Sequence, residues 1–228
     1  MALFARRADA LEKIAAPLRA VAPVHCYAGD VRDPAALQSA ADDFTAAHGP
    51  ADVVIANAGV SRGTSTAERE DIAVFRAVLE TNVLGLVHTF HPFLPAMLAR
   101  RSGTLAGIAS VAGFRGLPGA GAYSASKAAA IAYLESLRVE LHGSGVAVVT
   151  ICPGYVATPM TARNPYRMPF LMQPDAAARR IARAIARQRR FYVLPAPMAL
   201  AGRLLKAAPR PLFDRMFARA PRKPRDPG

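Results

Sequence analysis

Tyr123 and Lys127 are spaced so that both side chains could take part in one proton transfer. If this stretch is helical, residues four apart lie on one face, and the phenol and the ammonium point into the same cleft. A free tyrosine has a pKa of about 10, and a neighbouring ammonium lowers it because the positive charge favours the phenolate. The pair therefore predicts a general acid or base that works near neutral pH. Since Tyr-x-x-x-Lys also occurs on many surface helices, the surrounding residues decide its meaning.

Polar residues and tight turns follow several predicted strands. Ser110 ends a buried strand 13 residues before Tyr123, and its hydroxyl could bind the same oxygen that Tyr123 protonates. Asn57-Ala58-Gly59 closes another buried strand, and Pro153-Gly154 follows a third. Asn82 interrupts an apolar helix, where its amide needs a partner. Because ligands of parallel α/β sheets bind beyond the carboxyl ends of the strands, these signals predict a single ligand site.

The elements that must position these residues alternate short apolar strands with longer helices, which is typical of a parallel α/β sheet. Near-continuous hydrophobicity in the strands predicts helices on both faces. Asp33 and Pro34 form a plausible N-cap and first turn of a helix. The predicted strands are 24–28, 53–59, 103–110, 145–154 and, as a final edge strand, 191–195; the predicted helices are 34–47, 70–101 with a break near Asn82, 122–142 and 175–188.

The NAG turn, the helix asparagine, the serine, the YxxxK pair and the PG turn, in this order, resemble the short-chain dehydrogenase/reductase (SDR) family in its single-domain form. The resemblance implies a Rossmann-type doubly wound parallel sheet, a nicotinamide cofactor and reversible carbonyl–alcohol oxidoreduction. It implies that Tyr123 is the acid/base and that Ser110 polarises the substrate oxygen. It also implies that Lys127 lowers the tyrosine pKa and holds the nicotinamide ribose, and that Asn82 positions a water in the proton relay.

The same resemblance assigns residues to the cofactor. NAD-preferring members carry an acidic residue after the family's second strand, where this chain has Arg6 and Arg7. A guanidinium matches a 2′-phosphate in charge and geometry, so we expect NADP(H) rather than NAD(H), with Arg6 as the contact. The other implied residues are Asp30 and Val31 beside the adenine, Asn57, Ala58 and Gly59 along the adenosine side, Tyr123 and Lys127 at the ribose, and Pro153, Gly154, Val156 and Thr158 over the nicotinamide.

The family's glycine-rich phosphate turn, TGxxxGxG, does not occur in this sequence. The first residues already match the family's second strand, so the first strand, the phosphate loop and the first helix are lacking. Because that strand is central in the Rossmann order, we expect unpaired backbone groups on its neighbours. Two explanations stay open: a start codon placed too late, which we favour, and a truncated paralogue impaired in cofactor binding. The alternative function is a non-catalytic binding or scaffold protein on a degenerate Rossmann fold.

Charge is divided unevenly along the 228 residues, whose net charge is +13. Residues 1–159 hold 13 basic and 13 acidic side chains, whereas residues 160–228 hold 16 and 3. We expect a Rossmann-type SDR domain in residues 1–195 and a basic C-terminal extension in residues 196–228. The extension is interpreted as a lid, a subunit contact or, ranked below these two combined, a peripheral membrane contact. A solvated arginine-rich face is an equal alternative, and residues 220–228 are expected to be disordered.

Composition argues against several other classes. Cys26 and Cys152 lie in apolar strands, which indicates buried free thiols in a reducing compartment. The sequence shows no signal-peptide-like stretch and no uninterrupted apolar run of 18 residues, so we expect a cytoplasmic protein without a spanning helix. His88 and His91 lack a third ligand nearby, so no metal site is expected. The basic tail lacks a recognisable motif for binding nucleic acid.

The segment from Met160 to Pro174 reads as a flap over the substrate. Its apolar and adaptable side chains favour a hydrophobic ketone or alcohol substrate. Arg115 is interpreted as a surface residue rather than as a contact to a substrate carboxylate. The family resemblance further implies a homodimer or homotetramer formed through the helices that carry Asn82 and Tyr123. The apolar flap residues are Met160, Met168, Phe170, Leu171 and Met172.

Overall fold

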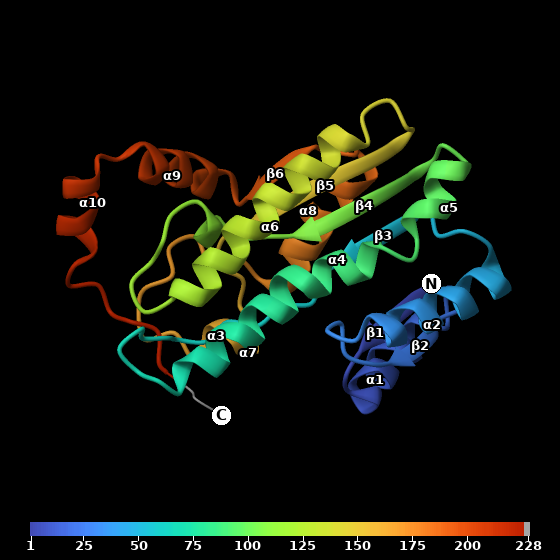
Figure 1. The fold of residues 1–228 in the computed structure, drawn as a ribbon, viewed down its shortest axis with the longest axis horizontal. Coiled ribbons are helices and arrows are strands. Elements are labelled where there is room, and N and C mark those ends of the chain that lie inside the picture. The colour runs from blue at the N-terminus through green and yellow to red at the C-terminus, as the bar shows by residue number, and fades with distance from the viewer. Residues whose placement is uncertain (226–228) are drawn as a thin grey trace.

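In a computed structural model, which describes residues 1–225, parallel strands alternate with helices. The strands form two separate sheets, one with the order β1-β2 and one with the order β3-β4-β5-β6. Figure 1 shows the smaller sheet, with α1 and α2, set beside the larger one. The strands are β1 (Ala2–Ala5), β2 (His25–Ala28), β3 (Val53–Ala56), β4 (Gly103–Ile108), β5 (Val146–Pro153) and β6 (Phe191–Leu194).

The helices lie close to where the sequence predicts them. Asp33 caps α2 as expected, because its carboxylate accepts hydrogen bonds from the backbone N–H groups of Ala35 and Ala36. The long helical region breaks at Asn82, where a π-helical turn, η1, separates α3 from α4. The helices are α1 (Ala8–Leu18), α2 (Pro34–His48), α3 (Asp71–Leu79), η1 (Glu80–Leu84), α4 (Gly85–Phe90), α5 (Leu94–Ala99), the 3₁₀ turn η2 (Val111–Gly113), α6 (Gly121–Glu140), α7 (Pro159–Ala162), α8 (Pro174–Ala186), α9 (Ala196–Ala207) and α10 (Arg210–Phe217).

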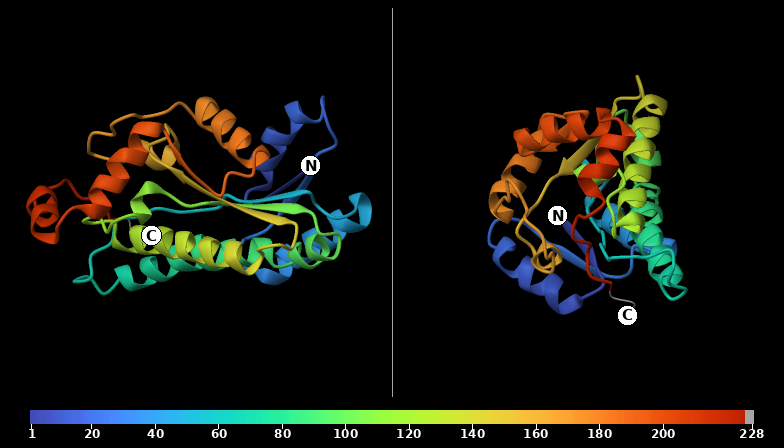
Figure 2. Two further views of the ribbon diagram at one scale, coloured as in Figure 1. Left: turned by 90° about the horizontal axis from the view of Figure 1, so that it is seen from above. Right: turned by 90° about the vertical axis from the view of Figure 1, so that its left-hand side faces the viewer.

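Helices cover both faces of the larger sheet, as the continuous hydrophobicity of β4 and β5 predicts. On one face, Phe90 of α4 and Leu134 of α6 belong to a buried cluster with Leu105 of β4. On the other face, Ile185 of α8 packs in a second buried cluster with Val149 of β5. Figure 2 shows α8 on one side of these strands and α4 and α6 on the other. The predicted doubly wound parallel sheet is confirmed.

One strand of the larger sheet is less buried than its sequence suggests. In β3, Val54 and Ala56 are buried, but Val53 and Ile55 are 47% and 48% exposed. The prediction of a fully buried strand at 53–59 is therefore wrong for every second residue. The reason is that α4 packs on one face of β3, whereas on the other face the main contacts of α8 are with β5 and β6. The predicted edge strand at 191–195 is confirmed as β6.

The division into two sheets leaves β1 and β3 with one strand neighbour each within residues 1–225. This is the pattern of unpaired backbone edges that the sequence analysis expects. The smaller sheet contacts the larger unit through α4. Nδ1 of His88 lies 3.1 Å from the carbonyl oxygen of Val31, and the side chain of Val31 lies against Gly85. Gly85 has no side chain, which allows this close approach.

The stretch Asp71–Phe90, formed by α3, η1 and α4, is long and apolar enough to cross a membrane by length and composition. The sequence analysis expects no spanning helix because no uninterrupted apolar run reaches 18 residues. By length and mean hydropathy, however, this stretch qualifies, so the expectation is corrected in that respect. A single helix of this kind is weak evidence, because the core helix of a soluble protein passes the same test. Val78 and Phe90 are buried in this stretch.

The chain beyond β6 forms α9 and α10, which lie at one end of the molecule in Figure 1. The segment that follows returns to the loops after β3 and β4. The expectation of disorder for residues 220–228 is wrong for residues 222–225, because side chains and backbone there make specific contacts with Ser61, Gly63 and Asp71. Residues 226–228 lie outside the described part of the chain.

Candidate active site

Ser110 and Tyr123 meet at the carboxyl end of β4. Ser110 caps η2, where its Oγ accepts a hydrogen bond from the N–H of Ala112 over 3.1 Å. The same hydroxyl donates to the carbonyl oxygen of Pro153 over 3.4 Å, which brings the end of β5 to the site. Tyr123 lies in the first turn of α6, and its hydroxyl is close enough to Ser110 for Ser110 to act on its pKa. Two hydroxyls from different elements therefore converge where the sequence predicts them.

Lys127 lies one helical turn after Tyr123 and is 5% exposed. Its Nζ donates a hydrogen bond of 2.7 Å to the carbonyl oxygen of Ile108 and lies 5.9 Å from the centre of the Tyr123 ring. Burial lowers the pKa of Lys127 to about 8, because removal from water disfavours the charged ammonium. The helical i, i+4 spacing thus places both groups on the face of α6 that points to β4, as predicted.

The pKa of Tyr123 differs from the expectation. Burial raises it, and the nearby Ser110 hydroxyl only partly opposes that effect. The sequence analysis expects Lys127 to lower this pKa, but the lysine nitrogen is bound to Ile108 and stands off from the ring. In this structure the phenol is therefore protonated at neutral pH and is ready to donate its proton.

Asn82 fastens the loop after β3 to α6. Its Oδ1 accepts a hydrogen bond of 2.8 Å from the N–H of Val60, and its Nδ2 donates to the carbonyl oxygen of Val60 and to Oγ of Ser126, both over 2.9 Å. The π-helical turn directs this fully buried amide inward. The role of Asn82 in positioning a water stays a prediction.

The nicotinamide end of the expected cofactor fits the residues around Lys127. A lysine ammonium has three donors, and within residues 1–225 only the carbonyl of Ile108 accepts one from Lys127. A side chain at Gly59 would begin 3.5 Å from that nitrogen, so the glycine keeps the space beside it open. Asn57 and Ala58 are exposed at the same sheet end. Two free donors beside an open backbone suit the hydroxyls of a ribose.

The turn after β5 also lies at this sheet end. Gly154 donates its N–H to the carbonyl of Leu194 over 2.7 Å. Val156 bridges to Met172 of the flap, and Thr158 begins α7, in a capping box with Thr161. The structure thus brings the predicted turn residues to the site and ties them to the flap.

The residues expected at the adenine end lie on the smaller sheet. Arg6 follows β1, and Asp30 and Val31 follow β2, so all three lie at the carboxyl edge of neighbouring strands. The pKa of Asp30 is lowered chiefly by its hydrogen bond with Arg32 and, more weakly, by the charge of Arg6. Arg32, which binds Asp30 over 2.7 Å, is a contact that sequence reasoning missed.

Sequence reasoning also missed side chains around Tyr123. Tyr155, directly after the predicted Pro153-Gly154 turn, stacks edge-on with Tyr166 of the flap at 6.4 Å between ring centres. The charge of Tyr123 acts on the pKa of Tyr166, which places the flap beside the site. Nζ of Lys223 lies 6.0 Å from the centre of the Tyr123 ring. Of these residues, only Tyr155 could have been found from the sequence, because it directly follows the predicted Pro153-Gly154 turn. Lys223 lies in a segment that has no motif or hydrophobic periodicity.

Two other sequence interpretations have structural outcomes. Arg115 binds the C-terminal extension, because it donates to the carbonyls of Leu205 and Ala208 and lies 4.2 Å above the ring of Phe213. Cys152 is a buried free thiol as expected, and burial raises its pKa to about 12, whereas Cys26 is only half-buried. Within residues 1–225, no group of three or more His, Cys, Asp or Glu residues could hold a metal ion.

Comparisons with known proteins agree with this geometry. The family model described as short chain dehydrogenase matches residues 1–167. An uncharacterized oxidoreductase of Myxococcus xanthus is 45% identical over 166 residues, which are 73% of this chain and 65% of the relative, so the chain spans less than two thirds of that relative's length. A putative short-chain dehydrogenase from Novosphingobium aromaticivorans has a TM-score of 0.77 at 26% identity, over 100% of this chain and 80% of that one. An alcohol dehydrogenase from Thermococcus sibiricus, solved with 5-hydroxy-NADP, has a TM-score of 0.73 at 27% identity, over 85% and 83%.

Proposed function

Because the chain belongs to the short-chain dehydrogenase/reductase family, we propose that it interconverts a carbonyl and an alcohol with a nicotinamide cofactor. One observation carries this proposal. The hydroxyls of Ser110 and Tyr123 converge at the carboxyl end of β4, where Ser110 is close enough to act on the pKa of Tyr123, and the buried ammonium of Lys127 lies one helical turn away. That arrangement holds a proton donor and a second hydroxyl donor where one carbonyl oxygen can receive both.

In the direction of carbonyl reduction, each side chain has a separate task. The reduced nicotinamide, when bound, supplies a hydride to the carbonyl carbon. Ser110 donates a hydrogen bond to the carbonyl oxygen and polarises it. Tyr123 donates the proton that completes the alcohol, and burial keeps the phenol in the protonated form that this step starts from. Lys127 holds the ribose hydroxyls with its two remaining donors, while Asn82 keeps the loop after β3 against α6.

The test is reduction of simple ketones by the purified chain with NADPH, in the wild type and in Tyr123→Phe. We expect kcat to fall by about 10²- to 10⁴-fold in the variant, which is the usual contribution of a positioned acid or base. The binding of NADPH, followed by thermal shift, should change little because the ring remains. Equal turnover in both proteins would contradict the assignment of Tyr123. Absence of NADPH binding and of turnover would favour a scaffold protein on the same fold.

We propose a preference for NADP(H), with Arg6 at the 2′-phosphate. The support is its exposed position at the carboxyl end of β1, beside Asp30, and the guanidinium's match to a phosphate. The Thermococcus sibiricus neighbour was solved with an NADP derivative. Arg6→Ala should lower kcat/KM for NADPH and leave that for NADH nearly unchanged. Equal use of both cofactors, unaltered in Arg6→Ala, would contradict the preference.

We also propose a hydrophobic ketone or alcohol as the substrate. The flap contributes exposed apolar side chains, among them Phe170 (54%) and Leu171 (44%). Such surface beside a catalytic site favours apolar ligands. Turnover of longer aliphatic ketones should exceed that of acetone, and turnover confined to small hydrophilic substrates would contradict this proposal.

Two surfaces support proposals about partners. Ile72 (64% exposed) and Leu84 (50%) lie on the helices α3 and η1, which suits a homodimer or homotetramer formed through these helices and α6; light scattering tests this.

On α9, Leu200 and Leu204 are 62% and 63% exposed, with Arg203 between them. Apolar side chains beside a positive charge support a peripheral contact of α9 with anionic membranes. Co-sedimentation with anionic vesicles, reduced in Leu204→Ser, tests it.

A further inference from the structure

The extended segment Arg222–Arg225, here called the C-terminal strap, lies against the loops that follow β3 and β4. The N–H of Gly63 donates to the carbonyl oxygen of Pro224 over 3.1 Å. A side chain at Gly63 would begin 2.5 Å from that oxygen, and one at Gly119 would begin 2.7 Å from Cβ of Arg222. Both glycines therefore allow the strap to approach the mouth of the catalytic site closely.

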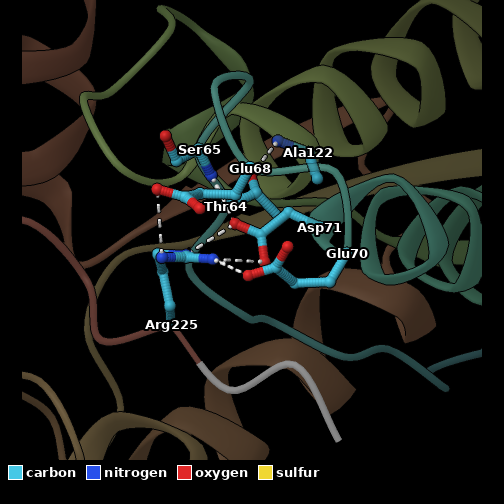
Figure 3. A network of polar contacts seen from close by, with 7 residues as sticks. All are labelled: Thr64, Ser65, Glu68, Glu70, Asp71, Ala122 and Arg225. Atoms are coloured by element: carbon cyan, nitrogen blue, oxygen red, sulfur yellow. Dashed lines mark hydrogen bonds and ion pairs between the residues drawn. The ribbon is translucent and has the colours of Figure 1, made fainter.

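Arg225 anchors the strap (Figure 3). Its Nε binds Oδ2 of Asp71 over 2.8 Å, and its terminal nitrogens lie 2.9 Å from Glu70 and 3.5 Å from Glu68. Asp71 is 3% exposed and also accepts a hydrogen bond of 2.7 Å from the N–H of Ser65. The guanidinium of Arg225 holds the pKa of Asp71 below its usual value. Three carboxylates, one of them buried, thus fix the end of the strap.

Lys223 has no such counter-charge among residues 1–225. Its Nζ donates to Oγ of Ser61 over 2.7 Å and lies 6.0 Å from the centre of the Tyr123 ring. The side chain is half-buried, and burial lowers its pKa. Within residues 1–225, no carboxylate lies within ion-pair distance of this ammonium. Nζ of Lys127 lies 5.9 Å from the centre of the same ring, so two ammonium groups lie close to the phenol of Tyr123.

A partly desolvated ammonium is costly unless acceptors or an opposite charge replace the lost water. Lys223 has three donors, and Ser61 is the acceptor that the described chain provides. A ligand at the mouth of the site is placed to satisfy the others. A substrate whose carbonyl oxygen sits on Tyr123 and Ser110, and whose negative group reaches Lys223, would do so.

We propose that Lys223 is a specificity residue that binds a carboxylate of the substrate, so that the substrate is an oxo acid or the corresponding hydroxy acid. This inference rests on the proposed function and narrows its substrate class to a carbonyl compound with an apolar chain and one negative charge. Docking of the strap is the task of Arg225, which has three carboxylate partners. Lys223 is therefore available for the ligand.

The experiment compares 5-oxohexanoate with 2-hexanone, which differ by the carboxylate, in NADPH-linked reduction by the full chain. The wild type should favour 5-oxohexanoate. Lys223→Met should raise KM for 5-oxohexanoate by about 10- to 100-fold, the usual effect of losing a charged hydrogen bond. KM for 2-hexanone should change by less than about twofold. Lys223→Arg, which keeps the charge, should retain most of the preference.

Arg225→Gln is the matched variant for the anchor. It should also raise KM for 5-oxohexanoate more than KM for 2-hexanone. The reason is that the strap that positions Lys223 is loosened, although the charge of Lys223 is intact. The inference is overturned if Lys223→Met changes KM for 5-oxohexanoate and KM for 2-hexanone by the same factor. It is also overturned if that variant turns over 2-hexanone faster, since Lys223 would then obstruct the site.

A binding measurement keeps the two proposals separable. Calorimetric titration of the full chain with 5-oxohexanoate should show binding in the wild type and in Tyr123→Phe, and its loss in Lys223→Met. Binding that depends on Lys223 without any turnover would contradict the proposed function and support the carboxylate site. Turnover of 2-hexanone without binding of 5-oxohexanoate would support the proposed function and overturn the carboxylate site.

Discussion

The two parallel sheets of this protein differ in how they are covered. In the larger sheet, β4 and β5 are buried on both faces by two clusters of side chains. Buried residues of the smaller sheet and its helices, such as Leu11 and Leu37, belong to neither cluster. The buried residues of the smaller unit are thus separate from both clusters, and this unit contacts the larger one through residues such as Val31, which lies against Gly85 and His88.

This difference separates two parts of the proposed activity. Tyr123 and Lys127 lie on α6, and Ser110 lies just after β4 as the cap of η2, all in the well-covered unit. Arg6 and Asp30, which we propose as cofactor contacts, lie on the lightly packed one. Chemistry that depends on short hydrogen bonds sits where packing is dense, and charge recognition, which tolerates more movement, sits where packing is sparse. Measurements of the free energy of unfolding in variants of each unit test this difference in packing.

The largest effect is expected from Leu134→Ala. Leu134 is fully buried on α6 and packs against Gly107 of β4. Loss of a buried leucine costs about 2–5 kcal/mol of the free energy of unfolding, because a cavity remains. Leu11→Ala in α1 is the matched change in the smaller unit. It should lower the free energy of local opening of that unit rather than the free energy of global unfolding. Denaturant unfolding with hydrogen exchange measures both, and equal effects on the main transition would show that the two units unfold as one.

A smaller effect is expected from pH. Burial lowers the pKa of Lys127 from 10.5 to about 8, so the unfolded chain binds more protons between these values and stability rises with pH there. From about pH 8 to 9 we expect a gain of about 1 kcal/mol. Above about pH 9 the thiol of Cys152, whose pKa burial raises to about 12, acts in the opposite direction. The gain should vanish in Lys127→Met, and an unchanged gain there would contradict its origin.

Local rules predicted much of the catalytic site. The i, i+4 spacing of Tyr123 and Lys127, and the position of Ser110 at a strand end, depend on nearby residues, and the structure has all three as expected. The pKa of Tyr123 could not be predicted in the same way. Its direction depends on how deeply the ring is buried and on where the nitrogen of Lys127 bonds, which tertiary packing decides.

Long-range contacts were outside the reach of the sequence. Arg225 and Asp71 are 154 residues apart, and neither carries a pattern that pairs them. The segment with Lys223 is rich in proline and charge, which is typical of disorder, yet it docks because three carboxylates and two glycines accept it. The exposure of Ile55 likewise depends on what covers the opposite face of β3 rather than on β3 itself.

The cap of α2 was predicted, and its removal should cost less than the loss of Leu134. Asp33→Ala removes the acceptor for two backbone N–H groups at the start of α2, which costs about 1 kcal/mol. Since α2 packs in the smaller unit, faster hydrogen exchange should be confined to α2 and its neighbours. Asp33→Asn, which keeps an oxygen acceptor, is the control. Faster exchange in β4 or β5 would show that the smaller unit supports the larger one.

The smallest effect is expected in β3, the strand of the larger sheet that faces the break between the two sheets. Val53→Thr and Ile55→Thr alter side chains that are about half exposed, and each should change the free energy of unfolding by less than about 0.5 kcal/mol. Val148→Thr, in β5, is the matched change at a position that is 3% exposed, and it should cost more because the hydroxyl is buried. A cost at Val53 or Ile55 as large as at Val148 would mean that in solution another surface covers this face of β3. The difference in packing between the two sheets would then hold only for the isolated chain. A covered β3 would extend the dense core as far as the gap between the sheets. The proposed cofactor contacts of the smaller unit would then belong to the same cooperative structure as the larger sheet.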